Sequence, residues 1–389
     1  MIDRQLAEYL TEIDAQYDII TITGPRQAGK TTLCRQFKPE LPYVNLEDPE
    51  VRLFAKEDPN QFLSQYPQGA ILDEIQRTPE LPSYLQVIVD DPLRQCQFYL
   101  SGSQSFALRN NLSQSLAGRT AILELLPLCY SEIHSAKPKN SLDELLFQGG
   151  FPRIYHRKIN ANRAMADYLA AYVDRDIRQL NMVRDLDQFQ KFLSLCAGRI
   201  GQLLNLSSIS NDLGISQPTA KEWLNLLEAS YIVFRLPPFF KNTRKRLVKT
   251  PKLYFYDTAL ACFLLNIEHP SQLVSHPLKG NLFENLVILE QIKKRFNRGK
   301  RHNLLFYRDS NGNEVDLIQP LAQGSLPIEI KLAGTFQSNL LKGIEKFRLE
   351  EPCPDGERLV YTGRPFVKES TKIVHYHDWF LSDPSQDFG

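Results

Sequence analysis

A phosphate-binding loop motif near the N-terminus constrains this chain more than any other feature. A β-branched run at 19–23 precedes the motif and predicts a buried strand, and a helical pattern follows from about 32. Strand, glycine-rich loop and helix in this order surround a polyanion with backbone N–H groups and a helix N-terminus. The sequence therefore predicts an α/β nucleotide-binding domain. The loop residues are Gly24, Pro25, Arg26, Gln27, Ala28, Gly29, Lys30, Thr31 and Thr32.

Two loop side chains have specific predicted roles. Lys30 would neutralise the β- and γ-phosphates of ATP, and the Thr31 hydroxyl would hold Mg²⁺. The alternative is a chance match on an ordinary strand–turn–helix, and the flanking segments argue against it. We therefore expect ATP and Mg²⁺ as cofactors.

A pair of carboxylates ends the next apolar run, at 69–72. Asp73 lies 43 residues after Lys30, and Glu74 follows it. At the carboxyl end of a strand, Asp73 would complete the Mg²⁺ shell and Glu74 would orient or deprotonate the attacking water. Such a pair is common by itself and becomes informative beside the loop. The glutamate favours hydrolysis over nucleotide binding alone.

Length and composition indicate a multidomain globular protein. The chain has 389 residues, which predicts two or three domains. We expect a P-loop domain at 1–135, a helical and winged-helix region at 136–265 and a third domain at 266–389. No apolar stretch reaches the ~18 residues of a membrane span, so we expect a cytoplasmic protein with no membrane segment. The six cysteines form no CxxC pair, which argues against a zinc site.

Charge is distributed unevenly along the chain. Residues 1–135 contain 11 Lys and Arg against 18 Asp and Glu, whereas the remaining residues contain 35 against 27. A basic second part makes nucleic acid a candidate partner. A scatter of solvated lysines would give the same total.

Residues 190–238 have a winged-helix pattern. Two predicted helices, 206–213 and 217–227, are joined by a turn and followed by a strand at 231–236. In DNA-binding proteins of this kind the start of the second helix enters the major groove. Docking of a protein is the alternative role. The residues at that helix start are Gln217, Thr219 and Lys221.

A basic segment at 241–252 follows the predicted strand. Six of its twelve residues are basic: Lys241, Arg244, Lys245, Arg246, Lys249 and Lys252. We expect this segment to extend a DNA-binding wing, because a basic run is the electrostatic signature of phosphate contact. A solvated loop is the alternative.

An acidic constellation marks the C-terminal third. Asp316 lies on the return strand of a predicted hairpin, and Glu329 and Lys331 follow on the next strand, on one face of it. Glu284, on a predicted helix, would add a third carboxylate. These residues predict a Mg²⁺ site in which Lys331 polarises the attacking water. The alternatives are a chance spacing, or a fold of this kind whose site only binds or stabilises.

Together these motifs resemble one family, the bacterial and archaeal AAA-type ATPases whose C-terminal half is a domain of unknown function with a restriction-endonuclease-like core. The resemblance spans nearly the whole chain. Its pieces include GPRQAGKTTL (24–33), YVNLEDPE (43–50), LDEIQRTPEL (72–81), YLSGSQSF (99–106), SLAGR (115–119), GGFP (149–152) and YFYDTAL (254–260).

The resemblance implies further site residues. Ser101 and Ser103 lie where AAA-type ATPases sense the γ-phosphate, although helix capping explains them equally well. Arg119 would be a sensor or finger arginine, acting on its own chain or on a neighbouring copy if the protein self-associates. A surface salt bridge is its alternative role. For Asp257, we expect helix capping.

The sequence supports three readings of function. We expect an ATPase whose C-terminal half contacts DNA or a partner under nucleotide control. An ATP-gated, metal-dependent nuclease is the first alternative, and a nucleotide-controlled switch or scaffold with slow hydrolysis is the second.

Overall fold

The computed structural model divides into two compact units, each of which is considered separately. The first unit consists of Met1–Leu128, Ala229–Tyr231 and Arg295–Arg301, and the second of Cys129–Glu228, Ile232–Lys294 and His302–Gly389. The structure describes residues 2–91, 93–94, 96–103, 116–138, 140–173, 177, 183, 185–240 and 249–382.

A five-stranded parallel sheet forms the centre of the first unit. Its strand order is β2 (Tyr43–Asn45), β3 (Ile71–Asp73), β4 (Phe98–Ser103), β1 (Ile19–Gly24) and β5 (Thr120–Glu124). Because all strands run in the same direction, their carboxyl ends meet at one edge, where ligands of open α/β sheets bind. The predicted P-loop strand corresponds to β1, and the strand before Asp73 corresponds to β3.

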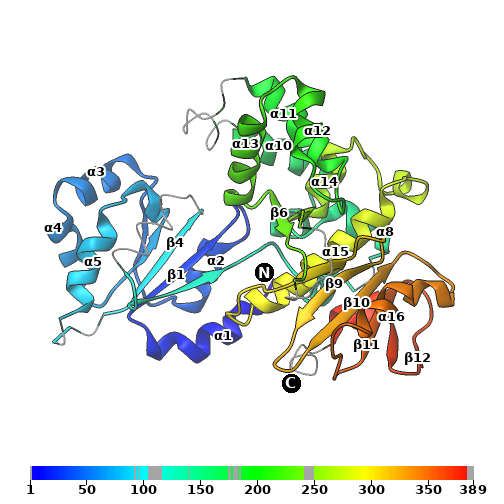
Figure 1. Ribbon diagram of the computed structural model, residues 1–389. Coiled ribbons are helices and arrows are strands. Elements are labelled where there is room, and N and C mark those ends of the chain that lie inside the picture. Colours follow the sequence, from blue (N-terminus) through cyan, green and yellow to red (C-terminus); the bar gives the residue numbers. More distant parts are fainter. Residues whose placement is uncertain are drawn as a thin grey trace. The chain divides into compact units, whose positions relative to one another are not determined.

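Two apolar cores lie on opposite faces of this sheet. Ile19 and Leu72 belong to one core, whereas their chain neighbours Ile20 and Ile71 belong to the other, as the alternation of side chains along a strand requires. Helices α3 (Pro49–Glu57), α4 (Pro59–Ser64) and α5 (Leu81–Val89) pack on the first face, and α1 (Leu6–Ile13) and α2 (Lys30–Phe37) on the second (Figure 1).

The second unit begins with a helical region. Its described helices up to the first strand pair are α7 (Tyr130–Ala136), α8 (Leu142–Gln148), α9 (Pro152–Arg157), α10 (Ala161–Tyr172), α11 (Leu186–Ala197), α12 (Leu206–Leu213) and α13 (Gln217–Ala229). Gly214 joins the last two in a left-handed conformation with φ 67°. Both helices predicted for the winged-helix pattern are therefore present.

A short antiparallel pair, β6 (Val233–Leu236) and β7 (Lys252–Phe255), follows these helices. Lys241, Arg244, Lys245 and Arg246 lie outside the described residues. Lys252 begins β7 and is only 3% exposed, so the prediction of a solvent-facing basic segment is wrong for this residue.

Helix α14 (Thr258–Leu264) comes next, and Asp257 caps it as predicted. Its carboxylate accepts hydrogen bonds from the backbone N–H groups of Ala259 and Leu260, and also from that of Gly150. The long helix α15 (Lys279–Phe296) then leads into the C-terminal sheet.

The C-terminal sheet is mixed and has six strands. Their order is β12 (Phe366–Lys368), β13 (Thr371–His375), β11 (Glu357–Tyr361), β10 (Ser325–Lys331), β9 (Glu314–Pro320) and β8 (Leu305–Arg308). Strands β10, β11 and β13 are parallel, whereas β8, β9 and β10 form an antiparallel meander. Helix α16 (Lys342–Arg348) packs on the sheet through Ile344 and Phe347, and α17 (Tyr376–Leu381) follows β13.

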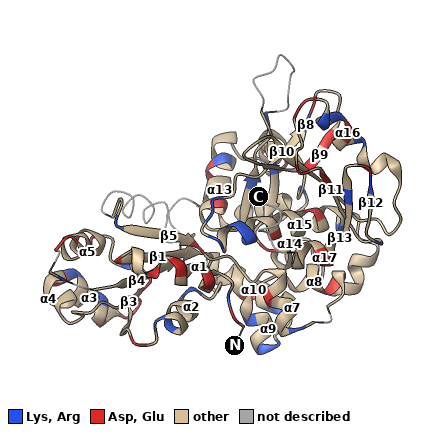
Figure 2. Cartoon of the chain, turned by 90° about the horizontal axis from the view of Figure 1, so that it is seen from below, with Lys and Arg blue, Asp and Glu red and all other residues tan. Residues whose placement is uncertain are grey.

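Basic residues are spread over the second unit. Figure 2 shows Lys and Arg on α9, α13, α16 and β12, rather than on one described element. Within the described part of the chain, no helix is long and apolar enough to cross a membrane.

Candidate nucleotide site and a second acidic cluster

The phosphate-binding loop depends on two glycines with positive φ. β1 ends at Gly24, with φ 147°, where a Cβ atom would lie 2.1 Å from the carbonyl oxygen of Leu125. Gly29, with φ 97°, precedes the first residue of α2. Only glycine adopts such conformations at little cost, so both glycines fix the path of the loop.

Lys30 is the buried cation of this loop. Its Nζ atom donates to the carbonyl oxygens of Gly24 (3.0 Å) and Pro25 (2.8 Å). Burial lowers the pKa of Lys30 to about 8, although the carboxylates of Glu74 and Asp73 oppose this effect. The loop therefore holds an ammonium group that lacks full charge compensation and would gain from a polyphosphate.

Asp73 joins side chains from three other elements. The hydroxyl groups of Thr31 on α2 and Tyr43 on β2 each donate to its Oδ2 atom at 2.9 Å. The hydroxyl of Ser101 on β4 donates to its Oδ1 atom. The sheet explains these contacts, because β3 lies between β2 and β4 and Asp73 is in register with Ser101.

The residues at this site fit a Mg²⁺ ion bound with a nucleotide. Thr31 and Asp73 present a hydroxyl and a carboxylate oxygen side by side. Oxygen ligands of this kind, supplemented by phosphates and water, are those that Mg²⁺ uses in nucleotide sites. The predicted pairing of Thr31 with Asp73 thus corresponds to a contact in the structure.

Glu74 leaves the strand direction immediately after β3. Its φ of 58° is left-handed, which is uncommon for a residue with a side chain. Burial raises the pKa of its carboxyl group, while Lys30 and Arg26 act in the opposite direction. A carboxylate with a raised pKa is a better proton acceptor near neutral pH.

Gln76 is a site residue that sequence reasoning missed. Its Nε2 atom donates to the carboxylate of Glu74 and to Ser103 Oγ (2.9 Å), so it links the two predicted catalytic residues. Its Oε1 atom is buried and has no hydrogen-bond partner among the described residues. The only sequence signal was its position two residues after Glu74.

Arg119 forms a surface ion pair in this structure. Its Nε and Nη2 atoms donate to the two carboxylate oxygens of Asp90, at 2.5 and 2.8 Å. The side chains are 35% and 45% exposed. Its predicted role at the γ-phosphate stays a prediction.

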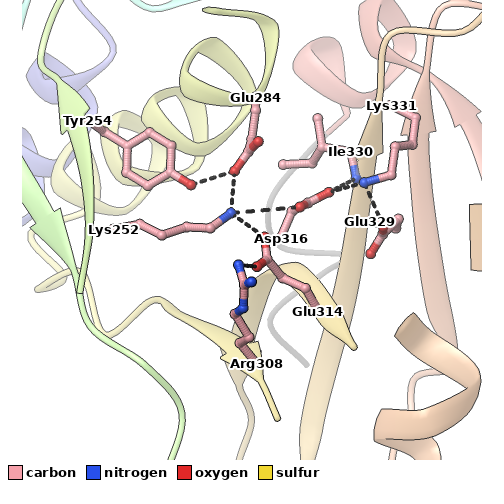
Figure 3. Close-up of polar contacts among 9 residues, drawn as sticks. All are labelled: Lys252, Tyr254, Glu284, Arg308, Glu314, Asp316, Glu329, Ile330 and Lys331. Atoms are coloured by element: carbon pink, nitrogen blue, oxygen red, sulfur yellow. Dashed lines mark hydrogen bonds and ion pairs between the residues drawn. The ribbon is translucent and has the colours of Figure 1, made fainter. Parts of the chain in front are cut away.

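In the second unit, the four predicted metal-site residues form one cluster (Figure 3). The Nζ atom of Lys331 on β10 lies 2.9 Å from Asp316 Oδ2 on β9 and 2.7 Å from Glu329 Oε1 on β10. The backbone N–H of Ile330 also donates to Asp316. Glu284 of α15 is joined to this group through a second lysine.

That second lysine is Lys252 of β7. Its Nζ atom lies 2.9 Å from Glu284 Oε1, 2.5 Å from Glu314 Oε1 and 3.9 Å from Asp316 Oδ1. Tyr254 donates a hydrogen bond to Glu284, and Arg308 binds Glu314 at 2.9 Å. The ion pairs of Lys252 had no sequence signal, because they join β7 to α15 and β9, which are distant from it in the chain.

Burial and the neighbouring lysines shift the pKa values of the acidic groups in different directions. Burial and the neighbouring Asp316 raise the pKa of Glu329 well above its usual range. Burial alone would raise the pKa of Asp316 as well, but Lys331 and Lys252 hold it below its usual value. Four carboxyl groups of this cluster lie beside three cations: Glu284, Glu314, Asp316 and Glu329 beside Lys252, Lys331 and Arg308.

The residues of this cluster do not fit a divalent metal ion as they stand. Across the part of the chain that the structure describes, no three His, Cys, Asp or Glu side chains are arranged to hold one. Here ammonium groups lie between the carboxylates instead.

Three segments of the chain match known families. Residues 16–134 match the AAA domain. Residues 139–271 match a domain of unknown function, DUF8612, and residues 279–379 match another, DUF4143.

The chain is also similar to several curated proteins and solved structures. It is 32% identical over 320 residues to the uncharacterized protein Rv2008c of Mycobacterium tuberculosis, covering 82% of this chain and 71% of that protein. It is 25% identical over 334 residues to the uncharacterized protein MJ1544 of Methanocaldococcus jannaschii, covering 77% and 71%. The Walker-type ATPase PABY2304 of Pyrococcus abyssi aligns with a TM-score of 0.45 at 17% identity, over 68% of this chain and 96% of that one.

Proposed function

The chain belongs to the same family as Rv2008c of Mycobacterium tuberculosis and contains an AAA domain, and on this premise we propose that it binds and hydrolyses MgATP in its first unit. The observation that carries the proposal is the contact of Thr31 with Asp73 beside the buried Lys30. A phosphate cradle, a buried cation and a pair of Mg²⁺ ligands meet there at the carboxyl edge of a parallel sheet.

Each residue has a definite task in the proposed reaction. Lys30 would exchange its two carbonyl contacts for phosphate oxygens. Thr31 and Asp73 would hold Mg²⁺, which would supply positive charge to the β- and γ-phosphates. Glu74 accepts the proton of the attacking water. Gln76 orients Glu74, and its Oε1 atom, which has no hydrogen-bond partner among the described residues, offers an acceptor for that water. Ser103, held by Gln76, is the proposed γ-phosphate sensor.

Substitution of Lys30 tests nucleotide binding directly. Lys30→Ala removes the ammonium group that contacts the carbonyl oxygens of Gly24 and Pro25 and that would bind the phosphates, so ATP binding should be lost in a calorimetric titration. Arg94→Ala, in the same unit and 54% exposed, serves as the matched control and should bind ATP normally. Unchanged affinity in Lys30→Ala would contradict the proposal.

We further propose that the second unit contacts a partner under nucleotide control, with DNA as the candidate. The supporting observation is the α12–α13 pair, because Gln217 and Lys221 are exposed at the start of α13. The proposed domain boundaries are 1–135, 136–265 and 266–389. The basic residues of 241–252 other than Lys252 would add phosphate contacts. Binding of labelled duplex DNA with and without a non-hydrolysable ATP analogue tests this proposal.

The nuclease alternative is not favoured by any described contact, since it requires a divalent metal among Asp316, Glu329 and Glu284. The switch alternative differs from the proposed ATPase only in rate. Slow turnover unaffected by DNA would favour the switch.

A further inference from the structure

The acidic cluster of the second unit already contains a cation at its centre. Lys252 of β7 forms ion pairs with Glu284 of α15 and Glu314 of β9. Figure 3 shows its ammonium group between these carboxylates and Asp316. A divalent ion bound by Glu284 and Asp316 would have to occupy the space that this ammonium group fills.

The backbone fixes Lys252 in this position. It pairs with Leu236 in the β6–β7 ribbon and also forms a bridge with Leu203. Its Nζ atom lies 5.6 Å from the centre of the Phe306 ring, and the residue is 3% exposed. A lysine held by its backbone on both sides, with its stem buried, does not swing out like a surface lysine.

The other side of Asp316 is closed by Lys331. One oxygen of Asp316 lies 3.9 Å from Lys252 and the other 2.9 Å from Lys331. Two ammonium groups at these distances repel a divalent ion strongly in a buried site. Meanwhile Glu329 Oε2, on a residue only 5% exposed, has no hydrogen-bond partner among the described residues. The cluster therefore retains a spare ligand atom beside two ammonium groups that repel a second cation.

We propose that Lys252 is the resident cation of this pocket, that it excludes divalent metal from the folded chain, and that replacing it with a neutral side chain creates a Mg²⁺ or Mn²⁺ site. Glu284, Asp316 and Glu329 are the ligands of the created site. Carboxylates gathered without a cation repel one another, so a metal ion takes over the role of the ammonium group.

The test is binding of Mn²⁺ to the full-length protein without nucleotide, measured by the loss of the free-ion spin-resonance signal. The wild type and Glu329→Gln should bind the same amount of Mn²⁺, because the pocket binds no ion in either protein. Lys252→Met, which keeps the length of the buried stem, should bind about one additional ion per chain. That ion should be lost in Lys252→Met combined with Glu329→Gln. Lys249→Met, at an exposed lysine of the same segment, is the matched control and should behave as wild type.

Thermal melting provides a second readout. Lys252→Met should melt at a lower temperature than wild type in EDTA and recover when Mn²⁺ is added, because the ion binds only the folded state. If this variant is unfolded without metal, recovery of cooperative melting with Mn²⁺ supports the proposal, and failure to recover contradicts it. Mn²⁺ binding by the wild type that Glu329→Gln abolishes would overturn the proposal. So would a folded Lys252→Met that gains no ion.

Discussion

Gln76 contacts both the proposed general base and the proposed γ-phosphate sensor of the first unit. Its amide donates to both Glu74 and Ser103, and Glu74 has a left-handed backbone conformation directly after β3. A precisely placed general base accelerates the reaction far more than one that is present but misplaced.

Gln76→Leu should therefore lower kcat for ATP hydrolysis by about 10²-fold and leave KM nearly unchanged, since the amide touches the base and not the phosphate cradle. Steady-state turnover over a range of ATP concentrations measures both constants. Gln61→Leu, at an exposed position on α4, is the matched control. A normal kcat in Gln76→Leu would remove Gln76 from the mechanism.

Lys30 predicts a pH dependence of ATP binding. Burial lowers its pKa to about 8 in the nucleotide-free protein, and phosphates favour the charged form. Binding is therefore coupled to proton uptake above pH 8, and ATP affinity should fall by up to tenfold per pH unit there. The lowered pKa of Lys30 has the opposite effect on the free energy of unfolding, which rises with pH where the ATP affinity falls. Because the unfolded lysine retains its proton up to its usual pKa, the contribution of Lys30 to stability rises between pH 8 and about 10.5.

Calorimetric titrations between pH 7 and 9.5 measure this dependence. Lys30→Arg should give a flat profile, because a guanidinium stays charged throughout this range. A flat profile in the wild type would mean that Lys30 is fully charged before ATP binds.

Motif residues and partner residues differed in how well they could be predicted. Lys30, Thr31, Asp73 and Glu74 could be proposed as site residues from the sequence, because the motif and its local spacing indicate their chemistry. Gln76 and Tyr43 acquire their contacts through strand order, which the sequence does not display. Lys252 was misassigned to a solvent-facing basic segment, because nothing in its sequence neighbourhood indicates the three carboxylates around it.

At the scale of elements, the close approach of β1 to the residues after β5 is the most demanding feature. Gly24→Ala should lower the free energy of unfolding of the first unit by at least about 1–3 kcal/mol, which is the cost of the unfavourable φ alone. The added Cβ atom would also overlap the carbonyl oxygen of Leu125. Gly280→Ala, on α15 with no atom near the added methyl, should leave stability unchanged or raise it by about 0.5–1 kcal/mol. Denaturant unfolding measures both. Equal stability of Gly24→Ala and the wild type would contradict the packing described.

A separate prediction concerns DNA binding by the helix pair α12–α13 and the basic segment at 241–252. Neutralising Arg244, Lys245 and Arg246 together should weaken binding to all DNA sequences alike and reduce the salt slope by about one per lost phosphate contact. Fluorescence anisotropy at several salt concentrations gives the slope. If the slope is unchanged, these residues do not contact phosphate.

Several elements could be predicted from the sequence, and helix α12 has the predicted bounds of 206–213. The strands at 19–24 and 71–73 and the helices at 206–213 and from 217 follow from periodicity and turn residues. The predicted strand at 231–236 begins only at Val233 in the structure, because Tyr231 adopts a left-handed conformation with φ 55°. The order of strands in both sheets depends on long-range pairing, which periodicity does not encode.

At the scale of the whole molecule, the two units carry different chemistry. The first has a buried ammonium group that lacks full compensation and gains from phosphate, whereas the second has buried ammonium groups already matched by carboxylates. An unsatisfied cation indicates a ligand, and a satisfied one indicates a structural role. This contrast favours the first unit as the site of the proposed catalysis.

The most direct measurement of that central claim is ATP turnover by Glu74→Gln beside its ATP affinity. The carboxylate acts on water and not on the phosphate cradle, so this variant should bind ATP as tightly as the wild type and release phosphate at least about 10²-fold more slowly. The wild type should hydrolyse ATP only in the presence of Mg²⁺. Equal phosphate release by Glu74→Gln and the wild type would contradict the account.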